Sequence, residues 1–324
     1  MTSRWKNFEY VEFGWDVTGF DRNGRACYGI GSGSLWEVHM EYNRNATAGK
    51  KFVEGILVSF GIMILFMMLQ MLVGYACALA AMAAYMVQTG NDMTHAQYAL
   101  YDIMNTSSFM TTLTVVATLA SVIFSLPAYW IVWGRKKTAQ DRQYFREKVL
   151  KLKTFSMIVL ASCGLYYLTI LIVAVMVVTS PGLMEEYTEM MDTALGGSQV
   201  LAMFAAVILA PVNEECIMRG LILKNLQRFF STPAVIIIQA VLFGIFHANW
   251  VQGIYVLPVG AALGYVAIKS KSVIPSIFMH LFYNTLSFVV VLLPEFCQTG
   301  LFAIGTVVVS AVAVWFMGRQ REES

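Results

Sequence analysis

Long apolar segments separated by short polar ones make up the chain from residue 52 onwards. An α-helix needs about 17 to 25 apolar residues to cross a hydrocarbon core about 30 Å thick, and these segments have that length or more. The pattern predicts an all-α, polytopic membrane protein with about eight transmembrane helices. The predicted spans are residues 52–88, 109–133, 154–179, 198–223, 233–250, 252–268, 273–293 and 300–317.

The first apolar segment, residues 52–88, is longer than one crossing requires. As a single helix it would be about 55 Å long. We expect either one long helix or a helix broken near Gly74. We count one crossing, because two would place the basic residues just before it on the opposite side from the other basic segments.

Basic residues recur at alternate ends of the predicted spans, and one acidic loop lies between them. The basic positions are Arg44, Lys50, Lys51, the segment 135–153, Lys224, Arg228, Lys269, Lys271, Arg319 and Arg321. The loop after Thr179 carries four acidic residues and no Lys or Arg. By the positive-inside rule the protein is a multi-pass cell-membrane protein with both termini in the cytoplasm.

Residues 1–51 have a different composition, rich in charged and aromatic residues. They are predicted to form an N-terminal cytoplasmic or interfacial extension before a transmembrane domain at residues 52–318. The segment Asp21–Gly24, between two aromatic-rich runs, is typical of a β-hairpin turn. Aromatic residues beside a first span are equally typical of the membrane interface, and the pattern does not choose between these two predictions.

The composition agrees with a membrane protein: 58% of the residues are hydrophobic, 13% are charged, and the mean hydropathy is +0.63. The net charge is only +2, without a basic block that would indicate nucleic acid, so the lipid bilayer is a predicted partner and nucleic acid is not. The five cysteines are scattered without CxxC spacing. They indicate neither a disulfide framework nor a zinc finger.

Five ionisable residues stand inside the spans, away from their flanking edges: Glu214, Glu215, Arg219, His247 and His280. A charged side chain near the bilayer centre costs at least ~2.5 to 3.5 kcal/mol on insertion scales, so each needs a partner, water or a function. Four residues apart on a helix, Glu215 and Arg219 are expected to pair. Glu214 is rotated by about 100° from Glu215 and is left over. In a purely structural alternative, these residues form a buried cluster that fixes helix packing.

These residue types suit hydrolysis of an amide bond by an activated water. A carboxylate in an apolar cavity can take a proton from water, which assigns Glu214 as the base. An imidazole N–H and an amide N–H can stabilise the resulting oxyanion, and His280 and Asn284 share a helix face four residues apart. His247 shares a face with Phe243, and it can orient the water or carry a proton to the leaving amine.

Three motifs resemble those of one family. Residues 211–220 resemble an EExxxR signature, residues 243–247 an FxxxH motif and residues 280–284 an HxxxN motif. Together they resemble the CPBP family, which comprises CAAX proteases and bacteriocin-processing (ABI) enzymes and is described as intramembrane glutamic endopeptidases. The resemblance covers about residues 198–293.

The resemblance implies a catalytic group and a supporting group of residues. Glu214 and His247 would activate water, His280 and Asn284 would bind the oxyanion, and Glu215, Arg219 and Phe243 would support them. It also implies membrane-associated peptides or proteins as substrates, and no cofactor or metal ion.

Two alternatives remain open. Glu214, His247 and His280 are residue types that bind zinc, which would make the protein a zinc metalloprotease, although the chain contains no HExxH motif. A non-catalytic membrane scaffold or bacteriocin immunity protein would use the same fold without hydrolysis, because a fold does not determine a function.

Overall fold

The structure is a computed structural model, and it describes residues 17–20, 26–30, 34–36, 47–89 and 93–319. Six of its helical segments are long and apolar enough to cross a membrane. They are Ala48–Gln88, Ser107–Lys136, Leu152–Thr179, Gln199–Leu226, Trp250–Ser270 and Ile274–Leu292, and two shorter apolar helices are Thr232–Phe246 and Gly300–Trp315. These elements correspond to the eight predicted spans, so the polytopic, all-α class is confirmed.

The first apolar segment is a single helix. It begins with α1 (Ala48–Lys50), continues through a π-helical segment (Lys51–Leu57) and ends with α2 (Val58–Thr89). Gly74 lies inside α2, and no break occurs there. Its membrane-spanning part, Ala48–Gln88, has 41 residues, which at 1.5 Å per residue is about 60 Å. The helix is therefore much longer than a hydrocarbon core is thick.

The remaining helices are defined by the following bounds. Those in or near the predicted spans are α4 (Ser107–Val132), α6 (Leu152–Thr179), α8 (Gln199–Met203), α9 (Ala210–Glu215), α10 (Leu223–Leu226), α11 (Thr232–Phe246), α12 (Trp250–Ser270), α13 (Ile274–Val289) and α14 (Gly300–Arg319). The connecting helices are α3 (Met93–Met104), α5 (Ala139–Tyr144) and α7 (Pro181–Leu195). The acidic segment after Thr179, predicted to be a loop, is therefore largely the helix α7, which begins with a proline at its first position, where no backbone N–H is needed.

A small antiparallel sheet precedes the helices. It consists of β1 (Val17–Phe20), β2 (Ala26–Ile30) and β3 (Ser34–Trp36) in the order β1-β2-β3. Phe20 is paired with Ala26, so the predicted hairpin is confirmed. The proposed turn at Asp21–Gly24 lies outside the described residues.

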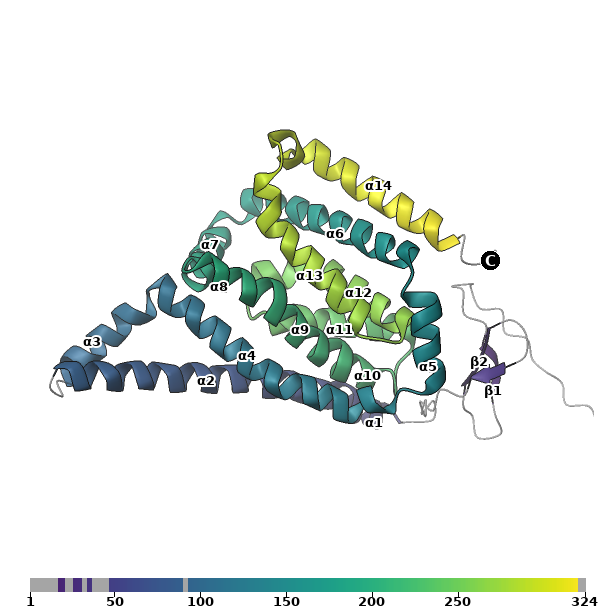
Figure 1. Ribbon diagram of the computed structural model, residues 1–324, viewed down its shortest axis with the longest axis horizontal. Coiled ribbons are helices and arrows are strands. Elements are labelled where there is room, and N and C mark those ends of the chain that lie inside the picture. Colours follow the sequence, from purple (N-terminus) through teal and green to yellow (C-terminus); the bar gives the residue numbers. More distant parts are fainter. Residues whose placement is uncertain (1–16, 21–25, 31–33, 37–46, 90–92, 320–324) are drawn as a thin grey trace, which may run out of the picture.

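The central helices are enclosed between two helix pairs (Figure 1). α2 and α4 pack on one side, α6 and α14 pack on the other, and α9 to α13 lie between them. Between α9 and α10 runs a π-helical segment (Cys216–Ile222) whose seven residues are all buried. Its apolar side chains join the largest hydrophobic cluster with residues of α2 and α11. The chain segment with the acids thus occupies the interior of the bundle.

Among the described residues, basic segments before, within and after α5 and at the ends of α10 and α12 lie at one end of the molecule, where Figure 1 shows α5 and α10. The Tyr144 hydroxyl donates to the backbone oxygen of Lys269 at 3.1 Å, and Lys137 Nζ donates to Ser272 Oγ at 3.0 Å. The segment after α4 therefore contacts the turn between α12 and α13. This agrees with the prediction that the basic positions share one side. Which side of the membrane that end faces stays a prediction.

Candidate active site

The helix that carries the acids departs from regular α-helix on both sides of them. A π-helical segment (Phe204–Leu209) precedes α9, and another (Cys216–Ile222) follows it. Pro211 lies inside the continuous helical segment Gln199–Leu226, directly after the first π-helical segment, so its missing N–H leaves an upstream carbonyl without its helical hydrogen bond. π-Helical turns inside helices are frequent at functional sites, because they redirect side chains and free backbone groups.

Glu215 and Arg219 form the predicted ion pair. Arg219 Nη1 donates to Glu215 Oε1 at 2.7 Å, and neither side chain is exposed to solvent. The guanidinium also donates through Nη2 to the backbone oxygen of Gly260 at 3.1 Å and lies over the Phe243 ring, 4.5 Å from its centroid. Removing two charges from water costs several kcal/mol each, so this pair needs these further contacts.

His280 lies between the two acids. Its Nδ1 is 3.0 Å from Glu215 Oε1, and its Nε2 is 3.7 Å from Glu214 Oε2. Because Glu215 already accepts from Arg219, the imidazole Nδ1–H is the donor in the shorter contact. Glu214 keeps 15% of its side chain exposed, whereas Glu215 is fully buried. The two adjacent carboxylates are thus in different environments.

His247 stands at the end of α11. The fifth span was predicted to run to Trp250, but α11 ends at Phe246, and Ala248 then has a φ of 51°. His247 Nδ1 lies 2.8 Å from the backbone oxygen of Phe243, one of the carbonyls that a helix end leaves without a partner. The ring therefore donates through Nδ1, and this tautomer leaves the Nε2 lone pair available.

The Phe243 ring links the two histidines. Its centroid is 4.8 Å from that of His247 and 5.9 Å from that of His280, in edge-to-face contacts. Arg219 covers the same ring. The three predicted motifs therefore meet in space, since each of them contributes a side chain to this contact.

Asn284 makes a contact that the sequence did not predict. Its Nδ2 donates to the backbone oxygen of Ala206 at 2.7 Å, in the π-helical segment before α9. One of its two amide hydrogens is thus committed to holding α13 against that segment. The other remains for a ligand.

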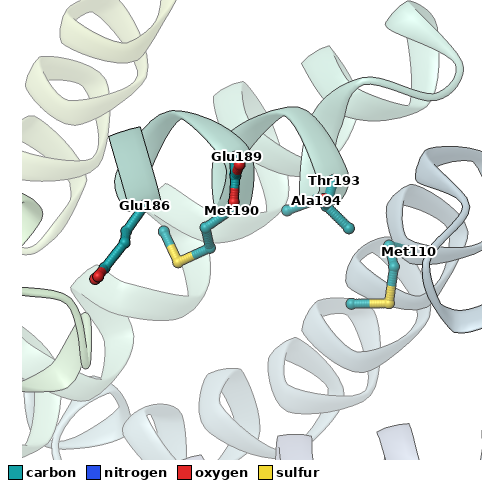
Figure 2. A pocket seen from close by; sticks show the side chains of 6 residues that line it. All are labelled: Met110, Glu186, Glu189, Met190, Thr193 and Ala194. Atoms are coloured by element: carbon teal, nitrogen blue, oxygen red, sulfur yellow. The ribbon is translucent and has the colours of Figure 1, made fainter. Parts of the chain in front are cut away.

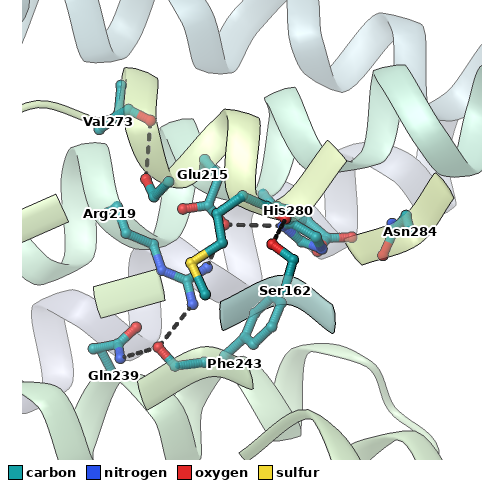
Figure 3. A network of polar contacts seen from close by, with 12 residues as sticks. Ser162, Glu215, Arg219, Gln239, Phe243, Val273, His280 and Asn284 are labelled. Carbon is teal, nitrogen blue, oxygen red and sulfur yellow. Dashed lines mark hydrogen bonds and ion pairs between the residues drawn. The ribbon is translucent and has the colours of Figure 1, made fainter. Parts of the chain in front are cut away.

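Sequence reasoning also missed two buried amides. Asn213 accepts hydrogen bonds from Ser121 at 2.9 Å and Ser125 at 2.8 Å, which fixes α9 to α4. Gln239 Nε2 donates to the Gly260 oxygen at 2.7 Å, and Arg219 donates to the same oxygen (Figure 3). The sequence signals for these contacts are weak. Gln239 is a single polar amide inside an apolar helix, and the partners of Asn213 are two serines four residues apart.

The described His, Cys, Asp and Glu residues contain no group of three placed to hold a metal ion. His247 and His280 each use Nδ1 in a contact with protein oxygen, which leaves Nε2 free and by itself argues neither for nor against a metal ligand. It is the placement of the described residues, with no group of three, that does not fit the zinc alternative.

An open cavity elsewhere in the molecule contains none of the predicted site residues. It has a volume of about 380 Å³ and lies between α4 and α7 (Figure 2). Its lining residues are Met110, Glu186, Glu189, Met190, Thr193 and Ala194.

Comparison with known proteins finds a family match over part of the chain. Residues 196–286 match the family model described as type II CAAX prenyl endopeptidase Rce1-like. No curated protein and no solved structure matches the chain. The matched segment contains the acids, both histidines and Asn284. The predicted links to ABI and bacteriocin-processing enzymes stay predictions. Over residues 196–286 the chain is therefore similar to Rce1-like type II CAAX prenyl endopeptidases, which is consistent with the CPBP/CAAX protease family and supports an intramembrane protease activity.

Proposed function

We propose that this protein is a glutamic intramembrane endopeptidase in which Glu214 activates the attacking water. The observation that carries the proposal is the difference between the two adjacent acids. Glu215 is fully buried and binds both Arg219 and His280, whereas Glu214 is partly exposed and lies 3.7 Å from His280 Nε2. Glu214 is therefore the carboxylate that can meet water and take its proton.

In the proposed reaction, water attacks the amide carbon while its proton passes to Glu214. The carbonyl oxygen becomes an oxyanion, and it needs donors placed where its charge develops. The Asn284 amide supplies one through the hydrogen that Ala206 does not use. His280 can supply the second through Nε2 only as an imidazolium, because its Nδ1–H is held by Glu215.

Collapse of this intermediate breaks the C–N bond, and the leaving amine must gain a proton. Glu214 can return the proton that it took from water. His247 is the alternative carrier, because its Nδ1–H is held by the Phe243 oxygen and its Nε2 remains free to accept and donate. The products are a carboxylate and an amine, and no covalent enzyme intermediate is needed.

The proposed substrates are membrane-associated peptides or proteins, cleaved beside the bilayer. The acids and histidines lie on helices that are membrane-spanning or apolar, and a peptide already held at a membrane reaches such a site without an energetically costly transfer from water. A lipid-tethered or hydrophobic segment meets this condition.

The substrates for the test are the membrane peptides that accumulate in cells expressing Glu214→Gln. The test measures the rate at which purified, reconstituted wild-type protein and the Glu214→Gln variant hydrolyse these peptides. Glutamine keeps the shape but cannot accept a proton, so we expect hydrolysis to fall by about 10²- to 10⁴-fold. Glu189→Gln, the same change on an exposed position of α7, should leave the rate unchanged. Wild-type rates in Glu214→Gln would contradict the proposal, whereas no hydrolysis by the wild-type protein itself would favour a non-catalytic scaffold.

A further inference from the structure

Asn213 stands immediately before the two acids and is only 1% exposed. Its Oδ1 accepts hydrogen bonds from Ser121 Oγ at 2.9 Å and from Ser125 Oγ at 2.8 Å. Both serines belong to α4 and are fully buried. We call Asn213, Ser121 and Ser125 the amide clamp. It fixes the short helix that carries the acids to a helix from a distant part of the sequence.

The amide clamp lies within a close contact between α4 and the segment that carries the acids. The buried side chains of α4 all belong to Ser or Thr, and they are Thr111, Thr118, Ser121 and Ser125. Small side chains of this kind let membrane helices approach closely. Before α9, the backbone N–H of Gly197 donates to Thr111 Oγ1 at 3.1 Å. After α9, a Cβ added at Gly220 would lie 2.7 Å from the Tyr129 ring.

Helix geometry lets the amide clamp set the direction of the acids. Successive residues of a helix are about 100° apart, so Glu214 is turned by about 100° from Asn213 and Glu215 by about 200°. With Asn213 directed to α4, both acids reach His280 of α13, at 3.7 Å for Glu214 and 3.0 Å for Glu215. The ion pair with Arg219 also holds Glu215, at 2.7 Å. The rotation of α9 therefore matters most for Glu214.

The short helix α9 does not determine this rotation by itself. It has only six residues, and a π-helical segment lies on each side of it. A π-helical turn contains more residues than an α-helical turn, so it shifts the faces of the helix that follows. Asn284 holds the preceding π-helical segment to α13 through the Ala206 oxygen, at 2.7 Å. The amide clamp supplies the attachment of α9 to α4.

The amide clamp contributes more to geometry than to stability. Hydrogen bonds between membrane helices stabilise a protein only modestly. A serine in a helix can also donate to a carbonyl of its own preceding turn, so the two hydroxyls have another place to bond. Two hydroxyls directed at one amide oxygen do, however, fix the register of two helices, as a single buried polar residue does in a coiled coil.

We propose that Asn213 is a positioning residue for the proposed base Glu214. It acts through the backbone of α9, by holding the rotation at which the Glu214 carboxylate reaches water and His280. This inference rests on the proposed function, because it assumes that Glu214 takes the proton of the attacking water.

The experiment measures kcat, KM and Tm of the reconstituted full-length Asn213→Leu variant, with the membrane peptides that serve as substrates for Glu214→Gln. Leucine keeps the branched shape but cannot accept a hydrogen bond. We expect kcat to fall by about 10- to 100-fold, because a displacement of a reacting group by about 1 Å can have an effect of this size. KM and Tm should stay close to those of the wild type.

A second measurement separates positioning from general damage. Asn213→Leu is combined with Glu214→Gln, and the residual rate is measured in single turnovers with enzyme in excess. A residue that acts through Glu214 has nothing left to position in this background, so the double variant should be no slower than Glu214→Gln alone. The matched control is Thr114→Val on α4. The Thr114 hydroxyl donates within its own helix, to the Met110 oxygen at 2.9 Å, so this variant should keep the wild-type kcat.

The inference and the proposed function fail in different ways. Wild-type rates in Glu214→Gln would overturn both. A slow Glu214→Gln together with a wild-type kcat in Asn213→Leu would overturn the inference alone. A further loss of rate in the double variant, or a fall in Tm that accounts for the lost activity, would make the role of Asn213 merely structural and overturn the inference as well.

If Asn213→Leu does not fold, the combined Ser121→Ala and Ser125→Ala variant breaks the amide clamp from α4. It should lower kcat by a similar factor. A wild-type kcat in this variant would overturn the inference.

Discussion

Gly264→Ala should destabilise the protein by disturbing the amide that lies behind the buried ion pair. A methyl group at this position of α12 would collide with Nε2 of Gln239 and lie 2.9 Å from its Cδ. Gln239 is fully buried and cannot swing into solvent. It would have to move away from the Gly260 oxygen, which it now contacts at 2.7 Å and which it shares with Arg219.

The magnitude follows from three effects. Extra volume in a packed interior costs about 1 to 3 kcal/mol. Gln239 Nε2 also donates to the Ile236 oxygen at 3.0 Å, so loss of the bond to Gly260 leaves one buried N–H without its partner, at about 1 to 3 kcal/mol. The higher helix propensity of alanine over glycine returns about 1 kcal/mol. We therefore expect a net destabilisation of about 1 to 5 kcal/mol.

Thermal unfolding in lipid vesicles measures this effect, and a double-mutant cycle assigns it. Shortening the amide in Gln239→Ala should remove the collision, so the double variant should be at least about 1 kcal/mol more stable than the sum of the single changes predicts. The control is Gly61→Ala on the exposed part of α2, where a methyl group meets nothing within 4 Å. It should be neutral or slightly stabilising. Equal Tm values for Gly264→Ala and Gly61→Ala would refute the reasoning.

Further predictions concern the charges, metal independence and topology. Glu215→Gln leaves Arg219 buried without its charged partner, so this change should cost about 3 to 5 kcal/mol of stability. It should also lower kcat, because the carboxylate that stabilises the imidazolium of His280 is lost. If the variant were inactive with an unchanged Tm, Glu215 rather than Glu214 would be assigned as the catalytic base. Proteolysis should survive chelators, and elemental analysis that finds one zinc per chain, lost and restored with activity, would contradict this. In a cysteine-free protein in intact cells, a single cysteine introduced at Lys137 should resist an impermeant thiol reagent, and one introduced at Glu189 should react with it. The reverse pattern would mean that the topology is inverted.

Local patterns in the sequence determined the membrane helices and the pairing of Glu215 with Arg219. Both follow from helix geometry alone: length and hydropathy define a span, and residues four positions apart lie on one face. The same reasoning identified Glu214 as the second acid, because it points to another face. The three motifs also predicted which helices would meet at the site.

Tertiary structure decided how the motif residues meet. His280 contacts both acids only because α13 packs against α9. His280 and Glu215 are 65 residues apart in the sequence. His247 lies at a helix end because α11 ends at Phe246. The apolar sequence around Phe246 does not indicate this boundary. The Gly260 oxygen shared by Arg219 and Gln239 depends on helices that approach from distant parts of the chain. A periodic pattern specifies which face of a helix is buried, but the partner on that face is chosen by the packing of the whole bundle.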